Sequence, residues 1–319
     1  MPCYNPLEAY RSKTVNASGK RSLVFNASQA LEGDVPLRLS CGQCIGCRLE
    51  RSRQWAVRCV HEASLHTYNS FITLTYDESN LPPNGSLIKK DFQEFVKRLR
   101  YHASDSSSEF YTALSTTNGR FRYFQCGEYG ENFGRPHYHA CLFGLSFSDS
   151  KHLKDVNGCP YYTSNVLNKI WGKGMCIVGD VTFESAAYVA RYCVKKVTGE
   201  KAVYYYNDID YATGEILCER VPEYTTMSRR PGIGADWLKK FRSDVYPSDE
   251  VVLRGVSQKP PKYYDRQYEI SCPESMELLK EKRSAKGKLR SSDLTTDRLK
   301  DRETVCKAKF NLLKRGYEK

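Results

Sequence analysis

Hydrophobic residues recur along the chain at two spacings, one typical of helices and one typical of strands. Phe92, Phe95, Val96 and Leu99 follow the i, i+3, i+4, i+7 pattern of an amphipathic helix, which we place over residues 89–102. Similar patterns predict helices over 47–66, 165–171 and 186–197. Segments rich in β-branched and aromatic residues predict strands over 71–76, 121–128, 136–143 and 175–181.

These elements follow one another as strand, helix, strand, strand, helix, strand, helix. A glycine-containing segment, 129–135, joins the second and third strands and indicates an antiparallel hairpin. The order predicts an α+β fold, an antiparallel split βαβ sheet with helices packed on one face. Residues 1–40 are expected to be irregular, and 204–211 is expected to form one strand of a hairpin that turns near Gly214.

Composition changes divide the chain into three parts. Residues 1–69 form a cysteine-rich N-terminal segment with a long helix, 70–245 form the core with an accessory segment, and 246–319 form a basic C-terminal tail. Lys and Arg outnumber Asp and Glu over 273–319, so the tail is expected to be a solvated helix or a disordered arm.

The charge balance favours a polyanionic partner. The chain carries 49 Lys and Arg against 37 Asp and Glu, a formal net charge of +12, and it has 23 tyrosines. Aromatic side chains interleaved with cations are what single-stranded nucleic acid stacks against, although most tyrosines can also simply pack in a core. No apolar run reaches the length of a membrane span and no signal sequence is evident, so a cytosolic protein without a membrane partner is expected.

Two histidines can bind one metal ion. His137 and His139 are two residues apart on a predicted strand, so they point to the same face while Tyr138 packs behind. Glu128 lies near the end of the partner strand, where a hairpin can bring its carboxylate beside the imidazoles. Such a set suits Mg²⁺ or Mn²⁺ better than Zn²⁺, since phosphoryl chemistry requires exchangeable, oxygen-friendly coordination. Alternatively, Glu128 only caps the turn or pairs with Arg135.

Two tyrosines share a face of the last predicted helix. Tyr188 and Tyr192 are four residues apart. Lys195 follows Tyr188 by seven residues and Tyr192 by three, and Lys196 follows Tyr192 by four, so both lysines lie near the same face. A phenol is a weak nucleophile at neutral pH unless a cation stabilises the phenolate, which a metal ion or one of these lysines can do. The alternative is that both tyrosines are core residues of an amphipathic helix.

Three cysteines have the spacing of a metal-binding motif. Cys41, Cys44 and Cys47 form C-x₂-C-x₂-C, with Cys3 or Cys59 as a fourth ligand, whereas the total of 13 cysteines is odd and scattered, which argues against a disulfide framework. The spacing suits the ligands of a zinc ion or of an iron–sulfur cluster, and a structural zinc ion is the preferred interpretation. Small buried thiols at a helix start are the alternative. No catalytic role is assigned to these cysteines.

Six motifs follow one another along the chain: CGQCIGC (41–47), FITLTYD (71–77), CGEYG (126–130), GRPHYHACLFG (134–144), YVARYCVKK (188–196) and MSRRPGIG (227–234). Together they resemble the H-U-H endonuclease superfamily, and most closely the replication initiation proteins of gokushovirus-like microviruses. The resemblance covers about residues 1–245, and the order and spacing of its motifs make it specific. One departure is Tyr138, where the superfamily typically has an aliphatic residue.

The resemblance implies a rolling-circle replication initiator. Tyr188 and Tyr192 would be alternating nucleophiles, with His137, His139 and Glu128 on the metal. One tyrosine would cut the single-stranded phage origin in the host bacterial cytoplasm, leaving a 5′-phosphotyrosine and a 3′-OH that primes the host polymerase, while a host helicase assists. The second tyrosine would later cut the regenerated origin so that a circle is released without ATP.

Other functions remain open at the level of sequence. A non-catalytic single-stranded nucleic-acid-binding protein can share this arrangement of elements. A single-tyrosine transposase or relaxase is a second alternative, which the paired tyrosines disfavour, and a structural zinc protein is a third. For backbone contacts to DNA, the expected cations are Arg135, Lys196, Arg229 and Arg230.

Overall fold

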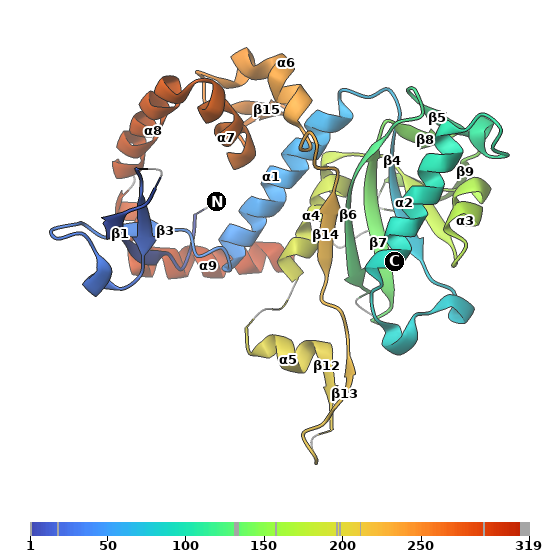
Figure 1. Ribbon diagram of the computed structural model, residues 1–319, viewed down its shortest axis with the longest axis horizontal. Helices are drawn as coiled ribbons and strands as arrows, with labels where there is room; N and C mark the ends of the chain where they lie inside the picture. The colour runs from blue at the N-terminus through green and yellow to red at the C-terminus, as the bar shows by residue number, and fades with distance from the viewer. Residues whose placement is uncertain are drawn as a thin grey trace. The chain divides into compact units, whose positions relative to one another are not determined.

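The computed structural model describes residues 2–17, 19–130, 134–156, 158–195, 197, 199–210, 212–289 and 291–312, and for 192–195, 201 and 291 the backbone alone. The described chain forms two compact units. Unit 1 comprises residues 2–51 and 282–312, and unit 2 comprises residues 52–281. The elements of both units are labelled in Figure 1. The division into residues 1–69, 70–245 and 246–319, expected from composition, stays a prediction.

A seven-stranded antiparallel sheet forms the centre of unit 2, with strand order β14-β6-β7-β4-β11-β10-β9. The predicted hairpin is present as β6 and β7, and the other predicted core strands correspond to β4 and β11. The strands are β4 (Asn69–Thr75), β6 (Arg122–Tyr129), β7 (Pro136–Phe143), β9 (Lys151–Val156), β10 (Cys159–Thr163), β11 (Cys176–Gly179) and β14 (Tyr224–Met227).

Helices cover both faces of this sheet, so the expectation of helices on one face was wrong. Helices α2 (Lys89–Ser104) and α3 (Asn165–Trp171) pack on one face, and α1 (Ile45–Ala63) and α4 (Phe183–Lys195) contribute to the cluster on the other. Figure 1 shows α4 beside β6 and β14, with α2 across the sheet from it.

The physical reason is that the central strands are buried on both sides. Along β7, Tyr138 and Leu142 pack into the cluster under α2, whereas Cys141 and Phe143 pack into the cluster under α4. Both sets of alternating side chains are therefore largely apolar, and each requires a covering helix layer.

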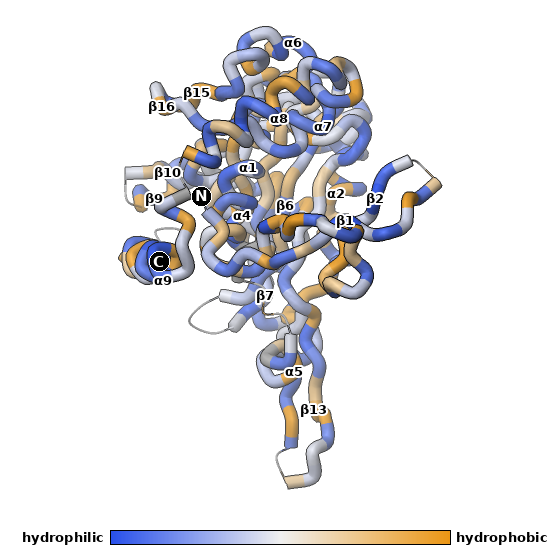
Figure 2. The backbone as a smooth tube through the Cα atoms, turned by 90° about the vertical axis from the view of Figure 1, so that its left-hand side faces the viewer, coloured by the Kyte–Doolittle hydropathy of each residue, from blue (hydrophilic) through white to orange (hydrophobic). Residues whose placement is uncertain are grey.

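Smaller elements surround the sheet. A two-stranded pair, β5 (Leu114–Thr116) with β8 (Leu145–Phe147), lies outside the seven strands. The region expected as a hairpin near Gly214 contains α5 (Lys201–Tyr206) and then strands β12 (Asn207–Ile209) and β13 (Ile216–Glu219). Tyr204–Tyr206 is thus helical rather than extended. Figures 1 and 2 both show this arm extending away from the sheet.

The chain after the sheet is mostly helical. Helices α6 (Ala235–Val245) and α7 (Lys262–Ser271) enclose a cluster that includes Leu238, Tyr264 and Met276, with the pair β15 (Val251–Leu253) and β16 (Val256–Gln258) between them. They are followed by α8 (Pro273–Lys288) and α9 (Thr296–Asn311), so the described residues from 273 onward are mostly helical.

The N-terminal segment contains strands, so the expectation that residues 1–40 are irregular was wrong. Strands β1 (Leu7–Val15), β2 (Arg21–Val24) and β3 (Leu37–Leu39) form a sheet in the order β2-β1-β3. The buried positions of β1 hold the small residues Ala9 and Ser12. Without large apolar side chains at alternating positions, the sequence pattern carries no strand signal.

None of the helices in the described chain combines the length and hydrophobicity that a membrane span requires.

Candidate active site

The hairpin register places the three side chains that are predicted to bind a metal ion on one face of the sheet. Glu128 of β6 lies directly opposite His137 of β7, and Cys126 lies opposite His139. Residues opposite each other in an antiparallel pair point to the same side, so Glu128 faces His137 directly and His139 diagonally. The convergence expected from the sequence is present in the structure.

The polar atoms of the three side chains lie close together. Oε1 of Glu128 lies 2.9 Å from Nε2 of His137 and 2.7 Å from Nε2 of His139. The ligand atoms of all three residues lie within 4.8 Å of one another. The side chains of Glu128, His139 and His137 are 0%, 2% and 12% exposed, so the centre is largely enclosed and accessible mainly at His137.

Burial raises the pKa of Glu128, but hydrogen bonds and charge from His137 and His139 outweigh burial and hold the pKa below its usual value. The carboxyl group is therefore ionised at neutral pH. An ionised carboxylate beside two imidazoles is a donor set that can bind a divalent cation.

Second contacts orient both imidazoles. Nδ1 of His137 donates to the backbone carbonyl of Arg135 at 3.1 Å, and Nδ1 of His139 lies 2.8 Å from Oγ1 of Thr73. Because a carbonyl only accepts, Nδ1 of His137 carries a proton. Nε2 is therefore the nitrogen of His137 that binds a metal ion once it is deprotonated. Such contacts hold a metal-ligating histidine in one tautomer and orientation, so this chain's residues fit a divalent ion.

Thr73 was missed by the sequence analysis. It lies on β4, opposite His139 in the β4–β7 register. The threonine is visible in the strand pattern, but which strand neighbours β7, and in what register, depends on contacts distant in sequence.

Helix α4 brings Tyr188 to the metal-ligand face. The helix begins with a reciprocal cap, in which Thr182 N donates to Ser185 Oγ at 2.8 Å and Ser185 N donates to Thr182 Oγ1 at 3.2 Å. The Tyr188 ring meets the His139 ring edge to face, with centroids 5.0 Å apart, and the Phe71 ring stacks on His139 at 5.7 Å.

Tyr188 is also a core residue. It is 5% exposed and packs in the same cluster as Val189 and Ala190. The core interpretation is therefore confirmed for Tyr188, and its role as a nucleophile stays a prediction. Packing holds the ring in place, and the ring lies against His139.

The remaining residues of the tyrosine motif are described only in part. Tyr192 and Lys195 belong to α4 by their backbone, with side chains outside the described residues, and Lys196 lies outside the described residues. The helical backbone places Tyr192 one turn after Tyr188.

Tyr138 packs behind the histidines, as expected. It is fully buried on the opposite face, and its hydroxyl donates to the Ile88 carbonyl at 2.8 Å and accepts from the Ile88 N–H at 3.1 Å. An aromatic residue fits here because its hydroxyl satisfies the backbone at the start of α2.

The cations expected to contact DNA lie in two places. Arg135 is beside His137 in sequence, and its guanidinium pairs with Glu78 and donates to the Tyr76 carbonyl at 3.0 Å. Arg229 and Arg230 are exposed and follow Ser228, whose N–H donates to the carbonyl of Tyr123, at the opposite end of β6 from Glu128. Five strand positions separate these ends, about 17 Å.

Four cysteines converge in unit 1. The Sγ atoms of Cys3, Cys41, Cys44 and Cys47 lie within 4.8 Å of one another. Cys59, the other residue considered as a fourth ligand, is fully buried in the cluster under α4 in unit 2. The structure thus selects Cys3 as the fourth member.

Comparisons with known proteins find replication-associated proteins of phages. The family model "Replication-associated protein ORF2/G2P" matches residues 69–197, the segment that holds both histidines and Tyr188. Replication-associated protein VP4 of Bdellovibrio phage phiMH2K is 33% identical over 298 residues, which cover 92% of this chain and 84% of that protein. Replication-associated protein ORF2 of Spiroplasma virus 4 is 31% identical over 276 residues, covering 83% and 77%.

Replication-associated protein ORF4 of Chlamydia phage 1 is more distant, with 28% identity over 232 residues that cover 71% of this chain and 52% of that protein. No solved structure matches the chain significantly. The sequence matches extend over both units, and the chain therefore belongs to the family of microvirus-like phage replication-associated proteins.

Proposed function

We propose that this protein initiates rolling-circle replication by nicking single-stranded origin DNA of the phage through a 5′-phosphotyrosine intermediate, and later rejoins the strand. It would act in the host bacterial cytoplasm, where a host polymerase extends the new 3′ end and a host helicase unwinds the template. The family membership supports a role in phage DNA replication. The observation that carries the chemistry is the contact between Tyr188 and the metal-ligand histidine His139.

The catalytic cation in this proposal is Mg²⁺ or Mn²⁺, held by Glu128, His137 and His139. When bound, such an ion withdraws charge from a phosphodiester and stabilises negative charge on oxygen. The enclosed carboxylate and the oriented Nε2 atoms support this assignment. Three protein ligands leave room for phosphate oxygens.

Tyr188 is proposed as the nucleophile. Its phenolic oxygen forms a bond to phosphorus, the bond from phosphorus to the 3′ oxygen breaks, and the phenolic proton is lost as the 3′ oxygen gains one. The products are a tyrosine ester of the 5′ phosphate and a free 3′-OH. In the reverse step a 3′-OH attacks phosphorus and the tyrosine oxygen leaves, so no nucleotide cofactor is consumed.

Tyr192 is proposed as the second nucleophile, with Lys195 as a cation that stabilises the developing charge. Helical spacing supports this, since residues four apart share a face. Two nucleophiles allow a second cut while the first ester persists, which releases a circle. A single-tyrosine enzyme would release its product differently and would not depend on Tyr192.

The test uses single-stranded oligonucleotides that span the phage origin, with Mn²⁺. Wild-type protein should become covalently joined to the 5′ side of the break, seen as a denaturation-resistant band. Changing Tyr188 and Tyr192 together to Phe should abolish the band, and each single change shows which tyrosine acts first. Tyr111→Phe is the matched control, since Tyr111 is 40% exposed and lies on a separate segment. Full joining by the double variant would exclude both tyrosines.

A second experiment separates catalysis from binding. His137→Ala should lose cleavage and keep most DNA affinity, because His137 lies in the metal centre rather than among the expected DNA-binding cations. Binding without any covalent product under all metal conditions would instead support the non-catalytic binding protein. Equal loss of binding and cleavage would point to a folding role for His137.

The proposed contacts of Arg229 and Arg230 with the DNA backbone are tested by measuring how DNA affinity depends on salt concentration. Alanine at both positions should weaken binding to every sequence and reduce the salt dependence of affinity by about two ion equivalents or less. Arg135 and Lys196 are retained as proposed DNA contacts, although the pairing of Arg135 with Glu78 must be exchanged for phosphate.

A further inference from the structure

The cysteine cluster of unit 1 has the geometry of a closed metal site. The four Sγ atoms lie within 4.8 Å of one another, and those of Cys3 and Cys44 are 3.9 Å apart. We propose that Cys3, Cys41, Cys44 and Cys47 bind one structural Zn²⁺ ion that holds unit 1 together. This proposal is independent of the nicking reaction.

The sulfur spacing favours a single ion. Zinc binds thiolates at about 2.3 Å, and tetrahedral geometry then separates neighbouring sulfurs by about 3.8 Å. The distance from Cys3 to Cys44 agrees with that value. In a four-iron cluster each thiolate binds a different iron atom, which spreads the sulfurs further apart than one ion does.

Backbone N–H groups point at the sulfurs of the cluster. Tyr4 N donates to Cys44 Sγ and Cys41 N to Cys3 Sγ, both at 3.3 Å. Cys41 Sγ accepts from Gln43 N at 3.4 Å and from Cys44 N at 3.3 Å. Donors of this kind stabilise the thiolate form that a metal ion requires.

Two glycines between the cysteines allow the backbone to bring the four sulfurs together. Gly42 has φ of 76°, a left-handed conformation that lets the chain turn between Cys41 and Cys44. A Cβ at Gly46 would lie 2.8 Å from Cε2 of Tyr4 and against the Pro2 carbonyl. Gly46 therefore lets the N-terminal segment approach the start of α1, which brings Cys3 to the other three cysteines.

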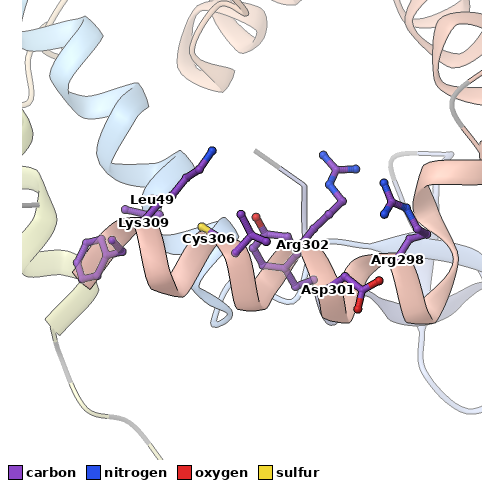
Figure 3. A pocket seen from close by; sticks show the side chains of 9 residues that line it. Leu49, Arg298, Asp301, Arg302, Cys306 and Lys309 are labelled. Carbon is purple, nitrogen blue, oxygen red and sulfur yellow. The ribbon is translucent and has the colours of Figure 1, made fainter. Parts of the chain in front are cut away.

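Unit 1 has little else to form a core. Within its described residues, the hydrophobic cluster at this site has Tyr4, Cys44 and Leu299 as buried members, and four of the five side chains packed around it are cysteines. Small units with such limited apolar burial commonly depend on a covalent or metal crosslink. The site joins the N-terminal segment to α1 beside α9, whose Cys306 and Arg302 line a hollow of about 550 Å³ with Leu49 and Tyr4 (Figure 3).

The experiment measures metal bound to the full-length protein after dialysis against EDTA. Elemental mass spectrometry should find about one zinc ion per chain. Cys41→Ser with Cys44→Ser should lower zinc about tenfold or more. Two controls should retain it: Cys306→Ser, a neighbouring thiol outside the set, and His137→Ala with His139→Ala, which removes the other metal-ligand group. Wild-type protein without zinc, iron with acid-labile sulfide, or full zinc in the cysteine variant would overturn the proposal.

If the cysteine variant fails to fold, the absorption spectrum of the wild-type protein with Co²⁺ in place of zinc still tests the proposal. Exchange of zinc for Co²⁺ should produce sulfur-to-cobalt charge-transfer absorption and the intense visible bands of a tetrahedral site. Cys3→Ser should weaken the charge-transfer absorption, whereas Cys59→Ser should leave it unchanged. Absence of these bands in the cobalt-exchanged protein, or the reverse ranking of the two variants, would contradict the assignment.

Discussion

The ring of Tyr188 lies 5.0 Å from the ring of His139, centroid to centroid, with the two planes at 86°. One residue belongs to helix α4 and the other to strand β7, 49 positions apart along the chain. The contact joins the proposed nucleophile to the proposed metal centre within one packed cluster. The packing that stabilises this face of the sheet therefore also holds the two proposed groups in place.

Thr73→Val should weaken metal binding without unfolding the protein. The threonine hydroxyl contacts Nδ1 of His139 at 2.8 Å and valine has nearly the same shape. Loss of such a contact typically reduces metal affinity or activity about 10- to 100-fold. The measurement is the Mn²⁺ concentration that gives half-maximal cleavage, together with direct Mn²⁺ binding. Thr73→Ser should restore both, and an unchanged Mn²⁺ requirement in the valine variant would show that Thr73 does not orient His139.

Tyr138→Phe should destabilise unit 2 by about 1 kcal/mol, because the partly buried N–H of Ile88 loses its acceptor, while the Ile88 carbonyl keeps the Asp91 N–H. The effect should be seen as a lower urea midpoint with an unchanged slope. Tyr111→Phe removes a hydroxyl at an exposed position and serves as the reference. Equal midpoints for the two variants would show that the Tyr138 hydroxyl contributes nothing beyond its ring.

Stability should fall in mild acid because of His61. Burial lowers the pKa of His61 from 6.5 to about 4, and its ring stacks on Trp237 with centroids 3.5 Å apart. Below pH 6.5 the unfolded chain binds a proton that the folded protein does not, so stability is lost as the pH falls from 6.5 toward 4 and the loss levels off below that.

The loss from this one group should reach about 2.5 kcal/mol at pH 4.5. His61→Phe keeps an aromatic ring against Trp237 and removes the titration. Urea unfolding at pH 7.5 and 4.5 should therefore show a smaller difference for the variant than for wild type. Identical pH dependence of the two proteins would mean that His61 titrates normally in the fold.

Gly46→Ala should loosen unit 1 while the proposed nicking centre in unit 2 stays intact. The added methyl group would collide with the Pro2 carbonyl and the Tyr4 ring, so the N-terminal segment must move away from α1. Limited proteolysis should cut the N-terminal segment faster, with retained zinc falling in parallel. Gly33→Ala offers a comparison without a steric collision, since no atom lies within 4 Å of its added methyl group, although the conformation there is strained. Equal protease resistance of the two variants would argue against the close approach at Gly46.

The sequence was informative where the physical rule is local. Alternation along a strand put His137 and His139 on one face, and the glycine-containing turn paired β6 with β7 so that Glu128 met them. The helical spacing likewise identified the segment that carries Tyr188. Each of these conclusions depends on residues close together in the chain, where backbone geometry leaves few alternatives.

Only the tertiary structure decided which distant segments meet. It placed Thr73 beside His139, selected Cys3 rather than Cys59 for the cysteine cluster, and covered both faces of the sheet with helices. It also showed strands in the polar N-terminal segment, whose buried side chains are too small to produce a hydrophobic pattern. Strand order, register and helix docking follow from packing summed over the whole chain. The spacing of residues along the sequence does not reveal this long-range packing, so these features could be seen only in the three-dimensional structure.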